Sequence, residues 1–261
     1  MTTLRTRRAP PPFRRVEVAS VAIRSPRLVR VTLAGPELAG FELGLPAGSV
    51  RLLLPHEGEA EVVLPRWNGN EFLDEDGARP TIRTLTPLRF DAATNQLDVE
   101  IVRHGDGPLS MWAEEVAAGA RAAVSGTGRG YDVDDDAPAF VLAGDESALP
   151  AISVLLPALP AGADVRVLVE VADGSARIDL PAGPTASVTW HEASPGALPG
   201  DAIVTAVERL ELASGTRVWA AGEAASMQRI RRHLFERRGI PRVHAAVRGY
   251  WKVGSGQVDA S

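Results

Sequence analysis

The sequence predicts a β plus α/β protein, with an N-terminal antiparallel β-barrel followed by a C-terminal, Rossmann-like parallel α/β domain. Short β-patterned runs broken by turn residues fill residues 16–125, and this spacing is typical of a small antiparallel barrel. Beyond residue 137, nearly continuous apolar strands alternate with helices, which indicates a parallel sheet buried on both faces. The acidic segment 131–138 holds a proline and has no apolar period, so it predicts a linker between the two domains.

The N-terminal half is expected to hold six strands and one helix. The strands are 16–23, 28–33, 50–54, 81–85, 97–102 and 121–124. The helix runs from Pro108 to about Ala117, because proline suits a first helical position and a glycine follows its end. If this is an ordinary capped helix, Met111, Val116 and Trp112 would fill the end of the barrel. The barrel domain is then 13–136, and the basic, proline-rich residues 1–12 form a disordered arm.

The C-terminal half, 137–261, is expected to hold five strands, three helices and a C-terminal tail. The strands are 140–143, 164–171, 186–190, 217–221 and 243–248, and the helices begin near 147 and cover about 202–211 and 223–238. The carboxyl ends of such parallel strands form the usual nucleotide site of this architecture. This half is therefore predicted to bind a dinucleotide.

Composition excludes several classes of function. The chain of 261 residues has no cysteine, so disulfides, thiolate metal sites and iron–sulfur clusters are absent, and redox chemistry would need a bound organic cofactor. The five histidines show no metal-binding spacing, so no metal site is expected. A formal charge of −5 argues against general nucleic-acid binding. No apolar run is long enough for a membrane span, and prolines follow Arg7-Arg8 where a signal peptide needs apolar residues. We expect a cytoplasmic monomer.

The first candidate site joins two segments. In an extended strand, Arg83 and Leu85 share one face while Thr84 and Thr86 share the other. We expect Arg83 to pair with a flavin pyrophosphate, and Thr86 to donate to the isoalloxazine. An ordinary surface strand is the alternative.

The second segment of this site begins at His104 and continues through Gly107, Pro108 and Ser110. It is interpreted as a helix start. The free N–H groups and positive dipole end of a helix start suit a phosphate. An ordinary capped helix is the alternative.

Two turns of small residues form the second candidate site. Gly144, Asp145 and Glu146 follow the first strand of the C-terminal half, where dinucleotide phosphates bind in α/β sheets. Gly222 and Glu223 lie in a strand-to-helix turn that would let a nicotinamide pass close to the backbone. A tight packing turn is the alternative for this second turn.

Five segments in order resemble the siderophore-interacting protein family, FAD-containing ferric-siderophore reductases of the ferredoxin–NADP reductase superfamily. They are 83–91, 104–113, 143–150, 221–224 and 250–254, and the resemblance spans about residues 13–254. It implies an FAD-binding barrel and an NAD(P)H-binding domain, with Thr86 at the flavin. It also implies basic residues at the flavin edge that hold an anionic ferric siderophore, matched here to Arg51, Arg129 and Lys252.

The resemblance implies a cytoplasmic enzyme that uses NADPH or NADH, reduces Fe(III) and releases Fe(II). A related flavin reductase with a ferredoxin or other redox partner, and a non-catalytic binding member, are the alternatives. The family pattern has a tyrosine where this chain has Leu85 and an arginine where it has Leu88. Glu170 would favour NADH by binding a ribose hydroxyl, whereas Arg177 or the arginine-rich helix 229–238 would favour NADPH.

Overall fold

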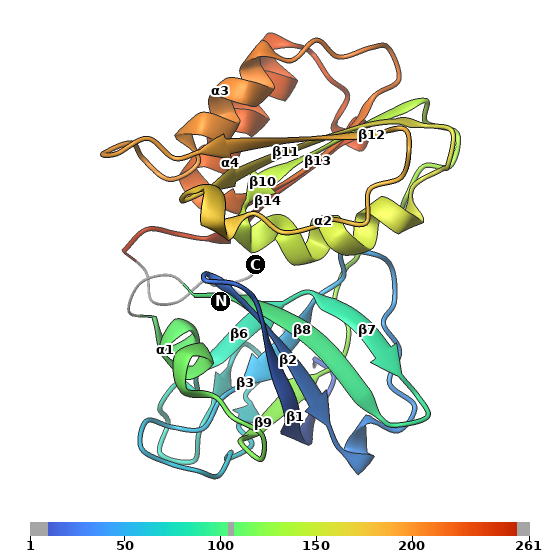
Figure 1. Ribbon diagram of the computed structural model, residues 1–261. Coiled ribbons are helices and arrows are strands. Elements are labelled where there is room, and N and C mark those ends of the chain that lie inside the picture. Colours follow the sequence, from blue (N-terminus) through green and yellow to red (C-terminus); the bar gives the residue numbers. More distant parts are fainter. Residues whose placement is uncertain (1–9, 104–106, 255–261) are drawn as a thin grey trace, which may run out of the picture.

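The computed structural model describes residues 10–103 and 107–254. Figure 1 shows two sheets, one in each half of the chain, with helix α2 (Leu149–Leu155) between them. Among the described residues, no helix is long and apolar enough to cross a membrane.

The N-terminal half folds into a seven-stranded antiparallel sheet curled into a half-barrel. Its strand order is β6-β3-β9-β1-β2-β8-β7. The strands are β1 (Phe13–Ser25), β2 (Leu28–Ala34), β3 (Val50–Leu53), β6 (Ile82–Leu85), β7 (Pro87–Asp91), β8 (Gln96–Val102) and β9 (Arg121–Ser125). A separate pair, β4 (Arg66–Trp67) and β5 (Phe72–Leu73), lies in the connection before β6. All six predicted strands are present. Three strands, β4, β5 and β7, were not predicted; β7 begins at Pro87, a position where proline costs no ladder hydrogen bond.

The inner face of the half-barrel is a core of alternating apolar side chains. Val50 and Leu52 of β3 are buried in it with Leu97 and Val99 of β8. Helix α1 (Pro108–Glu115) closes one end of this core. Met111, which the alternative of an ordinary capped helix places in the end of the barrel, is 50% exposed and does not fill it.

Leu109, Trp112 and Val116 pack against that core beside the buried Ala113. The helix ends two residues before the predicted end, because Val116 has an extended ψ of 132°. At the end of β9, the Ser125 hydroxyl donates to the Pro11 carbonyl at 2.7 Å. This bond attaches part of the N-terminal segment to the sheet.

The C-terminal half folds into a five-stranded parallel sheet of order β12-β11-β10-β13-β14. The strands are β10 (Ala139–Asp145), β11 (Asp164–Val171), β12 (Ala186–Glu192), β13 (Arg217–Glu223) and β14 (Ala245–Trp251). Helix α2 covers one face, and α3 (Asp201–Arg209) and α4 (Ala224–Arg232) cover the other. Strand order reverses between β10 and β13, so the carboxyl ends of these two strands form the switch point at which α/β sheets bind ligands.

Two predicted bounds in this half need correction. The helix predicted to end at Arg238 leaves α geometry after Arg232 and continues as a π-helical turn, His233–Arg237. The last strand begins at Ala245 after a short 3-10 turn, Arg242–His244. Both changes lie at element ends, where periodicity carries the least information.

The two halves meet over an apolar surface and the ion pairs Arg27–Glu146 and Asp134–Arg217. Leu28 and Val102 of the half-barrel pack against the core that contains α2. Beside them, Arg27, in the turn between β1 and β2, pairs with Glu146 at the end of β10, with an N–O distance of 2.8 Å. The carboxyl ends of the parallel strands are thereby held against the half-barrel.

Candidate functional site

Strand β6 presents its residues as the alternation predicts. Leu85 lies opposite Val50 and Arg83 opposite Leu52, and the core positions of β3 place these side chains toward the inside of the half-barrel. Thr84 lies opposite Arg51 on the outer face. Thr86 follows the last residue of the strand and is buried. Arg83 and Thr86 can therefore serve one bulky ligand, because Thr86 lies beyond the strand end.

Arg83 is a half-buried cation. Its Nη1 donates to the Ile82 carbonyl at 2.8 Å, and burial lowers the pKa of its guanidinium, which still remains protonated near neutral pH. A partly desolvated guanidinium binds an anion more strongly than a solvated one. This position therefore suits a phosphate.

Helix α1 begins beside the same core and has an unfilled hydrogen-bonding position. Its N-cap Gly107 is extended and Pro108 follows; a Cβ added at Gly107 would meet nothing within 4 Å. The Ser110 hydroxyl is buried and has no hydrogen-bond partner among the described residues. A buried hydroxyl normally finds a partner, so an anion at this helix start fits the residues present. His104 lies outside the described residues.

The two family positions occupied by leucine behave differently. Leu85 is half-buried against the barrel core. Leu88 falls at an irregularity in the ladder, between the pairs that Pro87 and Arg89 form with β8. The neighbouring Arg89 lies 3.7 Å from Asp98 and 4.0 Å from Asp91, so it faces these acids.

A hydrogen bond joins Thr86, directly after β6, to the C-terminal half. The side chain of Thr86 bonds to that of Tyr250, on the last strand, and burial raises the pKa of the Tyr250 phenol. Trp219 packs edge-on against the Tyr250 ring, with centroids 6.3 Å apart. From the sequence, Tyr250 was a candidate only as part of segment 250–254 of the family resemblance. Its contact with Thr86 could not be predicted, because the two residues are 164 positions apart.

The two glycines of the nucleotide turns are required by the packing of the protein itself. A Cβ on Gly144 would lie 2.3 Å from the Ala221 carbonyl oxygen and 2.4 Å from the Ala148 Cβ, and a Cβ on Gly222 would lie 2.6 Å from Asp145 Oδ2. These separations are too short for a side chain. The tight packing turn, which the sequence analysis left open for Gly222, describes both positions.

The acidic residues of these turns are already bonded within the protein. Asp145 accepts hydrogen bonds from Ser147, Glu223 and Trp251. Glu146 accepts from the Arg27 Nε at 2.8 Å and from the Ala172 N–H at 2.7 Å.

Two further acids cap helices. Glu223 accepts from the Ser226 N–H and caps α4. Glu170 accepts from the Gly200 and Ile203 N–H groups, at 2.7 and 3.0 Å, and so stabilises the start of α3. Each Glu170 oxygen thus accepts one backbone hydrogen bond, so this buried carboxylate has a structural role at the start of α3.

A groove with two adjoining parts begins at the carboxyl ends of β10 and β11 and continues along α3 to Arg209, the last residue of that helix, away from the carboxyl ends of the strands. The part nearest the half-barrel has a volume of about 210 Å³ and is lined by Arg27, Asp145, Ser147 and Trp251, among others. The larger part, about 570 Å³, lies between β12 and α3 and is lined by Thr189, His191, Thr205 and Arg209, among others. Both parts share four lining residues, Glu170, Ala193, Ala197 and Leu198.

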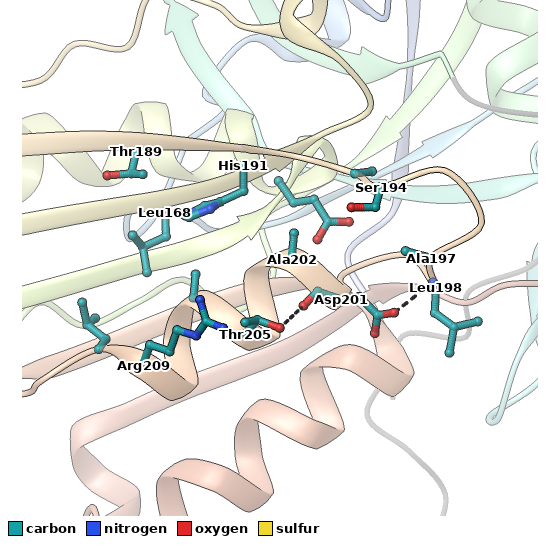
Figure 2. A pocket seen from close by; sticks show the side chains of 14 residues that line it. Leu168, Thr189, His191, Ser194, Ala197, Leu198, Asp201, Ala202, Thr205 and Arg209 are labelled. Atoms are coloured by element: carbon teal, nitrogen blue, oxygen red, sulfur yellow. Dashed lines mark hydrogen bonds between the residues drawn. The ribbon is translucent and has the colours of Figure 1, made fainter.

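Figure 2 shows the larger part of this groove, with His191 on the sheet side and Thr205 and Arg209 on α3. The His191 Nε2 is buried and has no hydrogen-bond partner among the described residues. The sequence analysis missed these residues and Arg27. A lone arginine or histidine gives no periodic signal, so the sequence offered no means of finding them.

The three candidate substrate residues come from neighbouring segments. Arg51 lies on β3, just after Ser49, whose carbonyl accepts from the Gly128 N–H at 2.6 Å. The exposed Arg129 follows Gly128. Arg248 of β14 donates to the carbonyls of Arg129 and Gly130, at 3.4 and 2.9 Å.

Lys252 is exposed directly after β14. The turn that carries Arg129 is thus held against the strand that leads to Lys252. No cluster of three or more potential metal ligands occurs within residues 10–103 and 107–254.

Comparisons with known proteins assign both halves. Residues 17–130 match the siderophore-interacting FAD-binding domain, and residues 137–254 match the siderophore-interacting protein family. A crystal structure of a siderophore utilization protein from T. fusca is similar, with 35% identity and a TM-score of 0.85, over 96% of this chain and 97% of that one.

Two curated relatives are similar over most of their length. An uncharacterized protein of Mycobacterium tuberculosis is 33% identical over 93% of this chain and 91% of its own. The ferric vibriobactin reductase ViuB of Vibrio cholerae is 29% identical over 89% of this chain and 87% of its own. Solved reductases at 15% and 19% identity share the fold alone.

Proposed function

Because the chain belongs to the siderophore-interacting protein family, we propose that it is an FAD-containing reductase that takes electrons from NADPH or NADH and reduces a ferric siderophore. The junction at Thr86 carries the proposal. This residue ends the flavin strand and bonds to Tyr250, next to Trp251 in the wall of the nucleotide groove. On this proposal, the flavin site and the nucleotide groove would meet at two consecutive residues of β14, Tyr250 and Trp251.

The residues of the half-barrel fit the proposed flavin. Arg83 and the start of α1, with the unpartnered Ser110 hydroxyl, would hold the phosphates. Thr86 would orient the isoalloxazine through its hydroxyl or backbone N–H. When bound, FAD supplies a group that accepts a hydride and returns single electrons, which no side chain does. We propose residues 13–136 as the flavin domain and 137–261 as the nucleotide domain.

The groove favours NADPH over NADH as the donor. Glu170, which would bind ribose hydroxyls of NADH, is engaged in capping α3. Arg209 is exposed in the larger part of the groove and provides a cation for a 2′-phosphate. We expect Arg209→Ala to raise the KM for NADPH about tenfold and to leave that for NADH within twofold, in steady-state assays with both donors. Equal changes would contradict this assignment.

The substrate would bind where basic residues gather at the junction. Arg51, Arg129 and Lys252 lie on neighbouring segments beside the flavin strand, and an anionic ferric siderophore would be attracted by this charge. Its Fe(III) is the electron acceptor. Reduction weakens the binding of iron by hard oxygen donors, so Fe(II) is released in the cytoplasm, where we propose that this monomer acts.

Spectroscopy of the purified protein tests the proposal. We expect a flavin spectrum with near-stoichiometric FAD, bleached by NADPH without oxygen and restored by a ferric siderophore but not by its iron-free form. A colourless protein that FAD does not reconstitute would refute it. Reoxidation by a ferredoxin but not by the ferric siderophore would assign a different acceptor.

A further inference from the structure

Asp145 collects four hydrogen bonds from three separate parts of the C-terminal half. Its Oδ1 accepts from the N–H and hydroxyl of Ser147, at 2.9 and 2.5 Å. Its Oδ2 accepts from the Glu223 N–H at 2.9 Å and from the Trp251 indole N–H at 2.8 Å. The carboxylate thus links the ends of β10, β13 and β14 at the switch point of the sheet.

The chemistry of these contacts requires both oxygens to act as acceptors. All four partners donate a hydrogen, so an ionised carboxylate satisfies them and an amide does not. Burial raises the pKa of Asp145, while the same donors oppose that shift. The close approach of Gly222, where a Cβ would lie 2.6 Å from Oδ2, leaves the carboxylate little room to turn.

Trp251 connects this centre to the nucleotide groove. Its half-buried ring lines the part of the groove nearest the half-barrel, together with Arg27 and Ser147. The preceding residue, Tyr250, bonds to Thr86, which directly follows β6. The position of the β14 end therefore affects both the groove wall and the flavin strand.

We propose that Asp145 is a positioning residue, which fixes the Trp251 indole as a wall of the groove and so sets where the nicotinamide end of the donor lies relative to the flavin strand. The inference rests on the proposed function. It differs from the expectation that Asp145 contacts the nucleotide, because both of its carboxylate oxygens already accept hydrogen bonds from the protein. Misplacement of a donor by about 1 Å slows a transfer reaction by up to about 100-fold.

The first experiment observes the contact directly and needs no activity. The chain has five tryptophans, so protein labelled with ¹⁵N-tryptophan gives one indole N–H signal for each. The signal lost in Trp251→Phe identifies that residue. Asp145→Asn should move this signal and speed its hydrogen exchange, while the other four signals stay in place.

The second experiment measures the groove and the transfer in the flavin-loaded protein. In Asp145→Asn, we expect NADP⁺ to bind about tenfold more weakly and NADPH to reduce the flavin about 10- to 100-fold more slowly, at unchanged FAD content. Trp251→Phe, which keeps the ring but removes the donor, should show part of both effects. The double variant should be no worse than Asp145→Asn alone, because both changes remove the hydrogen bond from Trp251 to Asp145.

Asp173→Asn is a matched control. Asp173 also accepts from the N–H and hydroxyl of the serine two residues on, at 2.8 and 2.5 Å, but it is exposed. The Asp173→Asn variant should therefore leave NADP⁺ binding and flavin reduction at wild-type values.

Wild-type NADP⁺ binding and reduction in Asp145→Asn, or effects of Asp145→Asn and Trp251→Phe that multiply in the double variant, would overturn the inference. If Asp145→Asn does not fold, wild-type NADP⁺ binding in Trp251→Phe overturns it. A wild-type protein that binds FAD but is not reduced by NADPH would instead refute the proposed function.

Discussion

Replacing Leu85 by tyrosine should tighten FAD binding, because it adds an aromatic ring on the inner face of the flavin strand. Leu85, in β6, lies opposite Val50 of β3 and is only half-buried. A ring at position 85 therefore has room to extend toward a ligand beside Arg83. Ring stacking contributes about 1 kcal/mol. This corresponds to a dissociation constant about fivefold lower.

Titration of the flavin-free protein measures this change. FAD is added to the wild-type and variant apoproteins, and the dissociation constant is taken from the change in flavin fluorescence. Leu85→Phe should give most of the gain, since it adds the ring without the hydroxyl, while Leu85→Ala should give none. Leu88→Arg, at the other leucine position, adds a charge-assisted phosphate contact of about 2 kcal/mol, or about thirtyfold.

One result would refute the reasoning about Leu85. If both aromatic variants bind FAD with an unchanged or higher dissociation constant, while urea unfolding shows them as stable as the wild type, the isoalloxazine does not stack at this position. The flavin site would then be built differently from that of the family.

The remaining predictions concern stability and pH. Arg27→Ala should lower the free energy of unfolding by about 2 kcal/mol in urea titrations, because it leaves the buried carboxylate of Glu146 without its ion pair. Burial lowers the pKa of His233 from 6.5. This residue therefore contributes stability above pH 6.5 that is lost as the pH falls toward the lowered pKa. His233→Leu should flatten this pH dependence of the unfolding free energy in urea titrations between pH 5 and 7.5. Gly144→Ala should cost about 3 kcal/mol or more by the same measurement, because its Cβ meets backbone at 2.3 Å, whereas Gly107→Ala should change stability by less than about 0.5 kcal/mol.

Each of these has a contradicting outcome. The exposed pair Arg66–Glu75 has the same 2.8 Å N–O distance, with side chains 80% and 77% exposed. Arg66→Ala should therefore lower the free energy of unfolding by less than about 0.5 kcal/mol. Equal losses of unfolding free energy in Arg27→Ala and Arg66→Ala would show that burial of Glu146 does not matter. A pH dependence that persists in His233→Leu would assign it to another group. Equal stability of the two glycine variants would mean that the Gly144 contacts can relax.

Much of the fold follows from local patterns. Period-two alternation located all six predicted strands of the half-barrel, and β11 has the predicted bounds, Asp164–Val171. One missed strand, β7, begins with Pro87, and the overlong helix continues past Arg232 as a π turn. Such errors arise at element ends, where tertiary contacts outweigh local preference.

The candidate site was only partly predictable. The face that Arg83 and Leu85 share follows from strand geometry, and the helix start at Pro108 follows from its residue types. Arg27 and Arg209 lie in the groove without any sequence pattern. Their positions depend on which strands become neighbours.

By itself, the sequence determined the two-part architecture, the order of the segments that carry the family resemblance, and which residue types are available for chemistry. Only the tertiary structure decided how the acidic residues are used. Asp145 bonds to groups 78 and 106 residues away, and Glu146 to an arginine 119 residues away. A carboxylate in a turn is chemically able to bind a nucleotide or to hold the protein together. Which of these it does depends on the donors that folding brings within hydrogen-bond distance.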